Sequence, residues 1–72
     1  MKLLEYIVKS IDPKSHIQLC EIISTLYIEI LDSHIAPSDA SYYGYFLIRS
    51  EPEDYEIFMD FNDLIVEIPK NK

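Results

Sequence analysis

The fold prediction starts from residues 12–35, which read DPKSHIQLCEIISTLYIEILDSHI. Asp12 followed by Pro13 is typical of a helix start, because an Asp side chain accepts hydrogen bonds from unpaired backbone N–H groups and proline has no N–H to leave unpaired. Ser15 with Gln18 offers an alternative capping box three residues later. Apolar residues then recur at helical spacing, at Leu19, Ile22, Ile23, Leu26 and Ile30. The sequence therefore predicts one long helix over this stretch.

A second apolar strip lies beside the first along the predicted helix, formed by Ile17, Cys20, Tyr27, Ile28 and Leu31. The two strips together occupy more of the helix surface than the roughly 100° stripe that packing on a single sheet requires. We therefore expect cover on two sides, from the sheet and from either residues 2–11 or a second copy of the chain. In these surroundings Cys20 is expected to be a buried thiol. Glu21 and Glu29 interrupt the apolar sequence, so a membrane span is not expected.

The segment before the long helix, residues 2–11, is expected to form a short helix of its own. Its apolar residues recur at helical spacing, at Leu3, Leu4, Ile7, Val8 and Ile11. The run from Tyr6 to Val8 leaves a strand open as the alternative, because periodicity does not separate the two structures in short apolar runs.

Three strands are predicted after the helices, over residues 42–48, 55–61 and 64–68. The second alternates between apolar and mostly polar positions, which is typical of a half-buried strand. Asn62-Asp63 is a two-residue hairpin signal, since both residue types tolerate positive φ. This turn would set an apolar register on one face, pairing Phe61 with Leu64, Met59 with Val66 and Ile57 with Ile68. The predicted fold is α+β in one domain, with a short and a long N-terminal helix followed by a three-stranded antiparallel meander packed on the long helix.

The 72 residues carry a net charge of −7, which argues against direct binding of nucleic acid or of anionic membrane surfaces. A basic protein partner is compatible with this charge. The single cysteine forms no internal disulfide, and the first residues lack the apolar run of a signal peptide. We therefore expect a cytoplasmic protein, in a bacterial host cell if the chain is encoded by a phage.

No combination of residues predicts catalysis, a metal site or a cofactor. His16 and Cys20 are one helical turn apart, but zinc requires four ligands, or three and a water. His34 lies 18 residues after His16, roughly 27 Å along a helix, and does not join it. The carboxylates near residue 54 have no neighbouring basic group or histidine that would separate an acid from a base.

Acidic and aromatic side chains of the last two predicted strands indicate a binding surface instead. Residues 51–67 contain seven acidic residues and no basic one. On the outer face of the predicted meander, aromatic and apolar anchors would lie within a rim of carboxylates, as in recognition surfaces. The candidate binding residues are Tyr43, Tyr45, Glu51, Glu53, Asp54, Glu56, Phe58, Asp60, Asp63, Ile65 and Glu67.

These features predict a small acidic protein-binding module, an inhibitor that neutralises a basic, nucleic-acid-handling partner. By composition the chain is similar in kind to small inhibitor proteins of bacteria and phages, including immunity proteins, antitoxins and anti-defence proteins that mimic nucleic acid. The alternative is a homo-oligomeric structural or accessory protein, with a homodimer formed through the central helix or apolar sheet residues.

Overall fold

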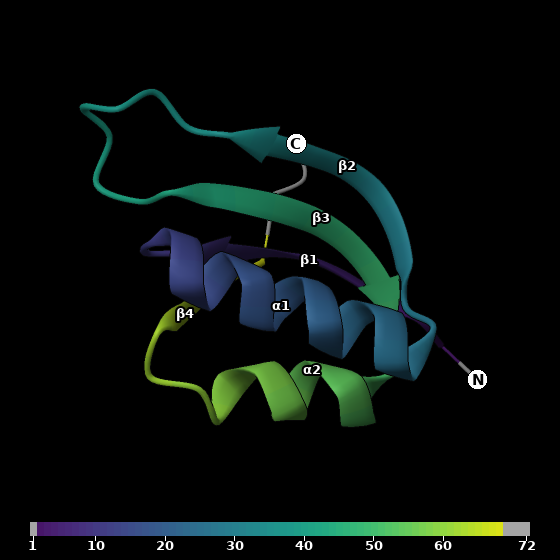
Figure 1. Cartoon of the computed structure of the whole chain (residues 1–72). Helices are drawn as coiled ribbons and strands as arrows, with labels where there is room; N and C mark the ends of the chain where they lie inside the picture. The colour runs from purple at the N-terminus through teal and green to yellow at the C-terminus, as the bar shows by residue number, and fades with distance from the viewer. Residues whose placement is uncertain (1, 69–72) are drawn as a thin grey trace.

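The structure is a computed structural model that describes residues 2–68. It is α+β, with two helices and a four-stranded antiparallel sheet (Figure 1). The elements follow in the order β1 (Leu4–Ser10), α1 (Pro13–Leu26), β2 (Glu29–Ile35), β3 (Gly44–Ser50), α2 (Pro52–Met59) and β4 (Leu64–Glu67). The strands lie side by side in the order β2-β3-β1-β4. This order of elements and strands is the split βαβ, or ferredoxin-like, arrangement.

Both helices cover the same face of the sheet, and the core lies between them and the strands (Figure 1). Side chains alternate between faces along a strand, so every second residue of β1 and β3 points to the helices. The buried residues of these two strands follow that alternation. The apolar core consists of Tyr6, Val8, Leu19, Ile23, Ile28, Phe46, Ile48, Phe58 and Leu64.

The start of α1 agrees with the prediction from Asp12 and Pro13. The Asp12 Oδ1 accepts a hydrogen bond of 2.8 Å from the Ser15 N–H, and the Ser15 Oγ accepts one of 3.1 Å from the Asp12 N–H. This capping box satisfies backbone groups that the first helical turn leaves unpaired. The helix packs on the sheet through Ser15, Leu19 and Ile23.

The prediction that the helix continues to residue 35 was wrong. The chain leaves the helix at Tyr27, which adopts the left-handed conformation with φ 55° and is 93% exposed. Residues 29–35 then form β2, which pairs with β3 and has a bulge between Ile30 and Asp32. A left-handed residue at a helix end is usually glycine or asparagine, so tyrosine gave no signal of the break.

The prediction of a short N-terminal helix was also wrong, and the strand alternative is the one observed. Residues 4–10 form β1, which lies at the centre of the sheet between β3 and β4. Tyr6, Val8 and Ser10 point to the core, and Ser10 is completely buried. A buried serine at the end of the strand hides the alternation of apolar and polar residues on which a strand prediction depends.

The predicted three-stranded meander and its hairpin at Asn62-Asp63 are contradicted as well. Residues 52–59 form α2, and the turn at residues 62–63 leads from this helix into β4. The strand β4 pairs with β1, with Val66 opposite Val8, and makes no ladder with residues 55–61. Pro52 at the first turn, followed by Glu53 and Asp54, is a helix start, because acidic residues interact favourably with the helix N-terminus.

The helix α2 also inverts the predicted faces of its residues. Phe58, expected on the surface, is completely buried against Tyr6, with ring centroids 6.0 Å apart. Ile57 and Met59, expected in the core, are 37% and 56% exposed. Neither helix in the described range has the length and hydrophobicity that a membrane crossing requires.

Candidate binding surfaces

The predicted binding residues do not share one face, because the segment that carries most of them is a helix and not a strand. Tyr45, Ile65 and Glu67 lie on the face of the sheet that points away from the helices. The acidic residues of positions 51–63 belong to α2 and its flanks, on the opposite side of the molecule. Phe58 is in the core, and Tyr43 contacts His16 at the start of α1, with ring centroids 5.2 Å apart. The prediction of a single outer surface was therefore wrong, and two separate surfaces replace it.

The first surface, here called the open sheet face, consists of the strand residues that point away from the helices. Strand register places Ile7 opposite Leu47 at its centre. Charged side chains surround this half-buried apolar pair. The members of this face are Glu5, Ile7, Lys9, Glu29, Asp32, His34, Tyr45, Leu47, Arg49, Ile65 and Glu67.

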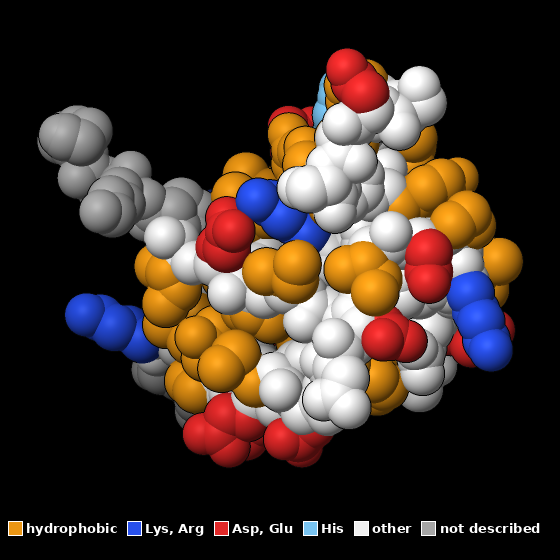
Figure 2. Space-filling view, turned by 90° about the vertical axis from the view of Figure 1, so that its left-hand side faces the viewer, with side chains coloured by type: hydrophobic (Ala, Val, Ile, Leu, Met, Phe, Trp, Pro, Cys, Tyr) orange, Lys and Arg blue, Asp and Glu red, His pale blue; other side chains and the backbone are white. Residues whose placement is uncertain are grey.

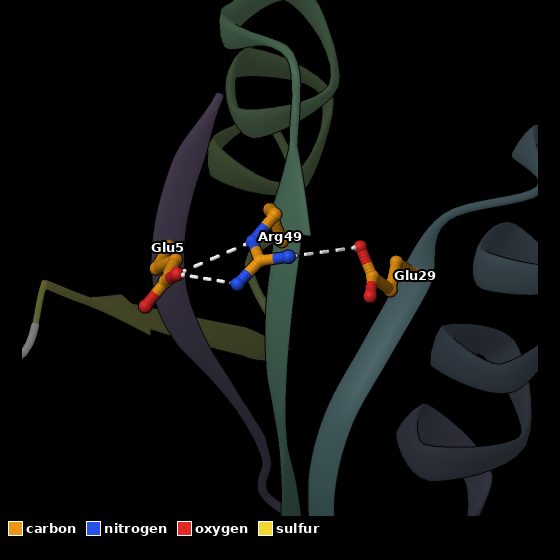
Figure 3. A network of polar contacts seen from close by, with 3 residues as sticks. All are labelled: Glu5, Glu29 and Arg49. Atoms are coloured by element: carbon orange, nitrogen blue, oxygen red, sulfur yellow. Dashed lines mark hydrogen bonds and ion pairs between the residues drawn. The ribbon is translucent and has the colours of Figure 1, made fainter. Parts of the chain in front are cut away.

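Charges on the open sheet face are arranged in ion pairs. Arg49 on β3 lies between Glu5 on β1 and Glu29 on β2 (Figure 3). Its Nη2 is 2.9 Å from the Glu5 Oε2, and its Nη1 is 3.5 Å from the Glu29 Oε1. The hydrogen bond to Glu5, with the negative charge of Glu29, raises the pKa of the Arg49 guanidinium above its ordinary value. One arginine thus compensates two carboxylates on the neighbouring strands.

Lys9 makes the second set of contacts on this face. Its Nζ lies 3.1 Å from the Glu67 Oε2 on β4 and 5.0 Å from the centroid of the Tyr42 ring. An ammonium group over an aromatic ring is attracted by the negative face of the ring. The ring of Tyr45 continues the row, 6.3 Å from Tyr42 and 5.7 Å from His34. The face therefore presents aromatic rings beside charges that are already paired.

The second surface, here called the acidic helix surface, consists of the carboxylates of α2 and its flanks. Its members are Glu51, Glu53, Asp54, Glu56, Asp60 and Asp63. None of them forms an ion pair with another residue of the described range 2–68. Figure 2 shows acidic side chains along its lower border, the side on which α2 lies. Helical spacing places Glu53, Glu56 and Asp60 on one side of the helix.

Apolar side chains lie among these carboxylates. Ile57 and Met59 are exposed on α2, and Ile57 borders a groove between the two helices. The groove has a volume of about 370 Å³ and is lined by Gln18, Glu21, Ile22, Thr25, Leu26, Ile57 and Phe61. Glu21 of α1 is the one carboxylate among the described residues that lines the groove, and the carboxylates of α2 lie beside it. The anchors that the sequence predicted are not among its lining residues.

Ser10 and His16 place a hydroxyl group within hydrogen-bond distance of an imidazole nitrogen, as a catalytic serine and its general base do. The Ser10 Oγ lies 2.8 Å from the His16 Nδ1 and donates to the Gly44 carbonyl oxygen at 3.2 Å. Ser10 is completely buried, so no substrate reaches its hydroxyl group. Burial also lowers the pKa of His16, whose ring stacks on Phe46 at 5.2 Å. We interpret the pair as a structural contact that fixes the start of α1 on the sheet.

The remaining predicted chemistry concerns metals and the cysteine. Cys20 is exposed, so the expectation of a buried thiol was wrong. Within the part of the chain that the structure describes, no three His, Cys, Asp or Glu side chains lie close enough together to hold a metal ion. The contacts of Arg49 and Lys9 were missed by the sequence reading, because their partners lie between 20 and 58 residues away along the chain. No local pattern carries such information.

A scan of protein-family models, a search of curated proteins and a search of solved structures each found no match to this chain. Because one fold can support many unrelated functions, the two surfaces of this molecule are the features that indicate its function.

Proposed function

We propose that this protein is a small acidic binding module that captures a basic protein partner through the acidic helix surface. The observation that carries the proposal is the uncompensated charge of α2 and its flanks. Six carboxylates lie there without an ion pair inside the described residues, whereas Lys9 and Arg49 pair with carboxylates on the open sheet face. Unpaired carboxylates attract a basic surface over a distance of about one Debye length, roughly 8 Å at physiological salt.

Specific contact would come from the apolar groove between the helices. Exposed Ile57 and Met59 lie beside Glu53 and Glu56, so a basic partner with an apolar side chain can bury them while its charges meet the carboxylates. Apolar anchors that lose their water supply most of the binding energy in such interfaces, and a charged rim mainly increases the association rate.

The partner class that fits best is a nucleic-acid-handling protein, because such proteins present clustered Lys and Arg to phosphates. Binding at that cluster would block it, which makes this protein an inhibitor, with no direct binding of nucleic acid by the chain itself. A cytoplasmic location is part of the proposal and is supported by the single cysteine, which has no internal disulfide partner. Enzyme activity is not part of it, since the only serine–histidine contact described above is buried.

The test uses fluorescence anisotropy with a labelled Arg-rich peptide as the probe. The variant E53Q/E56Q/D60N removes three charges from the acidic helix surface, and the matched control E5Q/E29Q/E67Q removes three from the open sheet face. We expect the first variant to lose most of the affinity and the control to retain it, with salt weakening the wild type. Equal losses in both variants would mean that only net charge matters and would contradict the proposal. The wild type then serves as bait for its natural partner, which should be basic.

A further inference from the structure

The strand β2 is an accessible edge of the sheet. It forms the upper border of the sheet in Figure 1, and six of its seven residues are exposed. Edge strands in natural proteins are usually protected by proline, by lysine or by a covering element. β2 contains neither proline nor lysine, and within residues 2–68 no strand or helix lies beyond it. Its bulge lies between Ile30 and Asp32, so residues 32–35 remain a regular edge. The opposite border, β4, has only four residues.

Backbone groups of β2 point outward from this edge. The Ala36 N–H donates to the Tyr43 carbonyl oxygen at 2.8 Å, toward the β3 side. Because hydrogen-bonding directions alternate along a strand, the N–H groups of Ser33 and Ile35 point away from β3. The Ser33 N–H agrees with this direction, since it donates to the Oδ1 of Asp32 at 2.9 Å and not to a neighbouring strand. The edge therefore offers the Ile35 N–H and the carbonyl groups of positions 33 and 35, and the Ser33 N–H becomes available when it exchanges its bond to Asp32 for one to a neighbouring strand.

We propose that two copies of this chain associate through their β2 strands, antiparallel and about a two-fold axis at Ser33. In this register Asp32 of each copy lies opposite His34 of the other, so two carboxylate–imidazole pairs flank the axis. No two like charges oppose each other in this register. A register centred on Asp32 would oppose two carboxylates, and one centred on His34 would leave Asp32 without a polar partner. The edge is complementary to itself, which identifies a second copy as its occupant.

The distribution of charge over the whole molecule also favours association through the β2 edge. Two chains that each carry a net charge of −7 repel each other, and the repulsion is weakest where their acidic surfaces are far apart. The helix α2 packs against β4 and β1, at the other end of the sheet from β2. Pairing through β2 therefore keeps the acidic helix surfaces at the two outer ends of an eight-stranded sheet.

An apolar hollow beside the edge adds area for the second copy to cover. It lies between α1 and β2, has a volume of about 450 Å³ and includes the exposed side chains of Tyr27 and Ile30. Its other lining residues are Cys20, Ile23, Ser24, Ile28 and Phe46. Apolar burial would thus accompany the new backbone hydrogen bonds.

The test measures mass in solution by light scattering for the wild type, for H34D, for D32K and for an equimolar mixture of the two variants. We expect the wild type to be a dimer at tens of micromolar. Each variant alone should dimerise on the order of tenfold more weakly, because both cross-strand pairs are lost at once. The mixture should regain dimers. The two substituted positions then face each other with opposite charges, and the unsubstituted Asp32 and His34 of the two copies form the original pair.

A second variant separates loss of pairing from loss of folding. Ser33→Pro removes an N–H that has no partner on β3, so the circular dichroism spectrum should be kept while the dimer is lost; Ser33→Thr is the matched control that retains the N–H. A monomeric wild type, a dimer unaffected by these variants, or a mixture that stays monomeric would each overturn the inference. Because it does not depend on the acidic helix surface, the peptide affinity of the monomeric variants should remain unchanged.

Discussion

The open sheet face and the acidic helix surface differ in how their charges are balanced. On the sheet Arg49 lies between Glu5 and Glu29, and Lys9 pairs with Glu67, whereas the carboxylates of α2 and its flanks form no ion pair within residues 2–68. Exposed ion pairs of this kind add little stability, since the median is about 0–1 kcal/mol. Their effect is to balance part of the negative charge of the sheet face, where Lys9 and Arg49 lie among Glu5, Glu29, Asp32 and Glu67. The helices therefore carry most of the negative potential by which this molecule attracts or repels other proteins.

If α2 is held in place by apolar contacts alone, removal of its one buried side chain should have the largest effect. Phe58 is completely buried and Met59 beside it is 56% exposed. We expect Phe58→Ala to cost about 3–5 kcal/mol and Met59→Ala less than about 1 kcal/mol, measured by urea unfolding. Because a domain of this size has only a few kcal/mol in total, Phe58→Leu provides a graded variant that should remain folded. Similar losses for Phe58→Ala and Met59→Ala would show that burial of Phe58 is not what holds α2 on the sheet.

The second-largest loss of stability is expected at Gly44, where β3 approaches β2 closely. A Cβ at position 44 would lie 2.8 Å from the His34 carbonyl oxygen and 3.1 Å from the His16 ring. We expect Gly44→Ala to cost about 1–3 kcal/mol, because the backbone of β2 must move away from β3. Ser41→Ala, in the exposed loop between these strands, is the control and should leave the urea midpoint nearly unchanged. A stable Gly44→Ala variant would mean that β2 moves freely at this end.

The two helices also differ at their N-termini, and this difference should be visible in the dependence of stability on pH. The backbone hydrogen bond from Ser15 lowers the pKa of Asp12, whereas Glu51 at the start of α2 makes no side-chain capping bond. A lowered pKa in the folded state means that the contribution of Asp12 is complete above its pKa in the unfolded chain. The contribution is then lost as the pH falls through the folded pKa.

Asp12→Ala should therefore reduce stability at neutral pH by less than Gly44→Ala does. The difference from the wild type should shrink as the pH is lowered below the ordinary range of aspartate. Glu51→Ala is the matched control, and its difference from the wild type should be small near neutral pH. A pH-independent difference for Asp12→Ala would show that the side chain acts without its charge. Urea midpoints measured from acid to neutral pH provide the data.

A comparison of the starts of α1 and α2 shows which parts of the fold were predictable from the sequence. The start of α1 depends on residues within one turn of each other, so Asp12 and Pro13 identified it correctly. The start of α2 carried an equally local signal in Pro52 and its acidic neighbours. That signal was overridden by the alternation of Tyr55, Ile57, Met59 and Phe61, although the residue that packs deepest in the core is Phe58. A spacing of three residues from Tyr55 to Phe58 to Phe61 fits the observed helix.

Long-range pairing accounts for the errors that no local signal could correct. The sheet centre joins β1 to β3, whose paired residues Tyr6 and Ile48 are 42 positions apart. Residues 27–35 continue the apolar character of α1, and only the pairing with β3 makes them a strand. The acidic character of residues 51–67 was evident from the sequence, but its division between two faces depends on α2 being a helix. The sequence therefore identified an acidic segment, but it placed Phe58 on the surface and Ile57 and Met59 in the core, the reverse of what the structure shows.

The smallest changes in stability are expected when single carboxylates of α2 are neutralised. The position of each carboxylate relative to the helix dipole should decide whether its removal stabilises or destabilises the protein. Glu53 lies in the first turn, near the partial positive charge of the N-terminus, and Asp60 is at the C-cap, near the partial negative charge. We expect Glu53→Gln to destabilise and Asp60→Asn to stabilise the protein, each by about 0.3–1 kcal/mol at low salt. Both substitutions remove one negative charge, so each is the control of the other for general repulsion. If both substitutions stabilise the protein in urea unfolding, repulsion among the carboxylates outweighs the helix dipole. If the two changes in stability have opposite signs and become smaller with added salt, the helix dipole determines how each carboxylate affects stability.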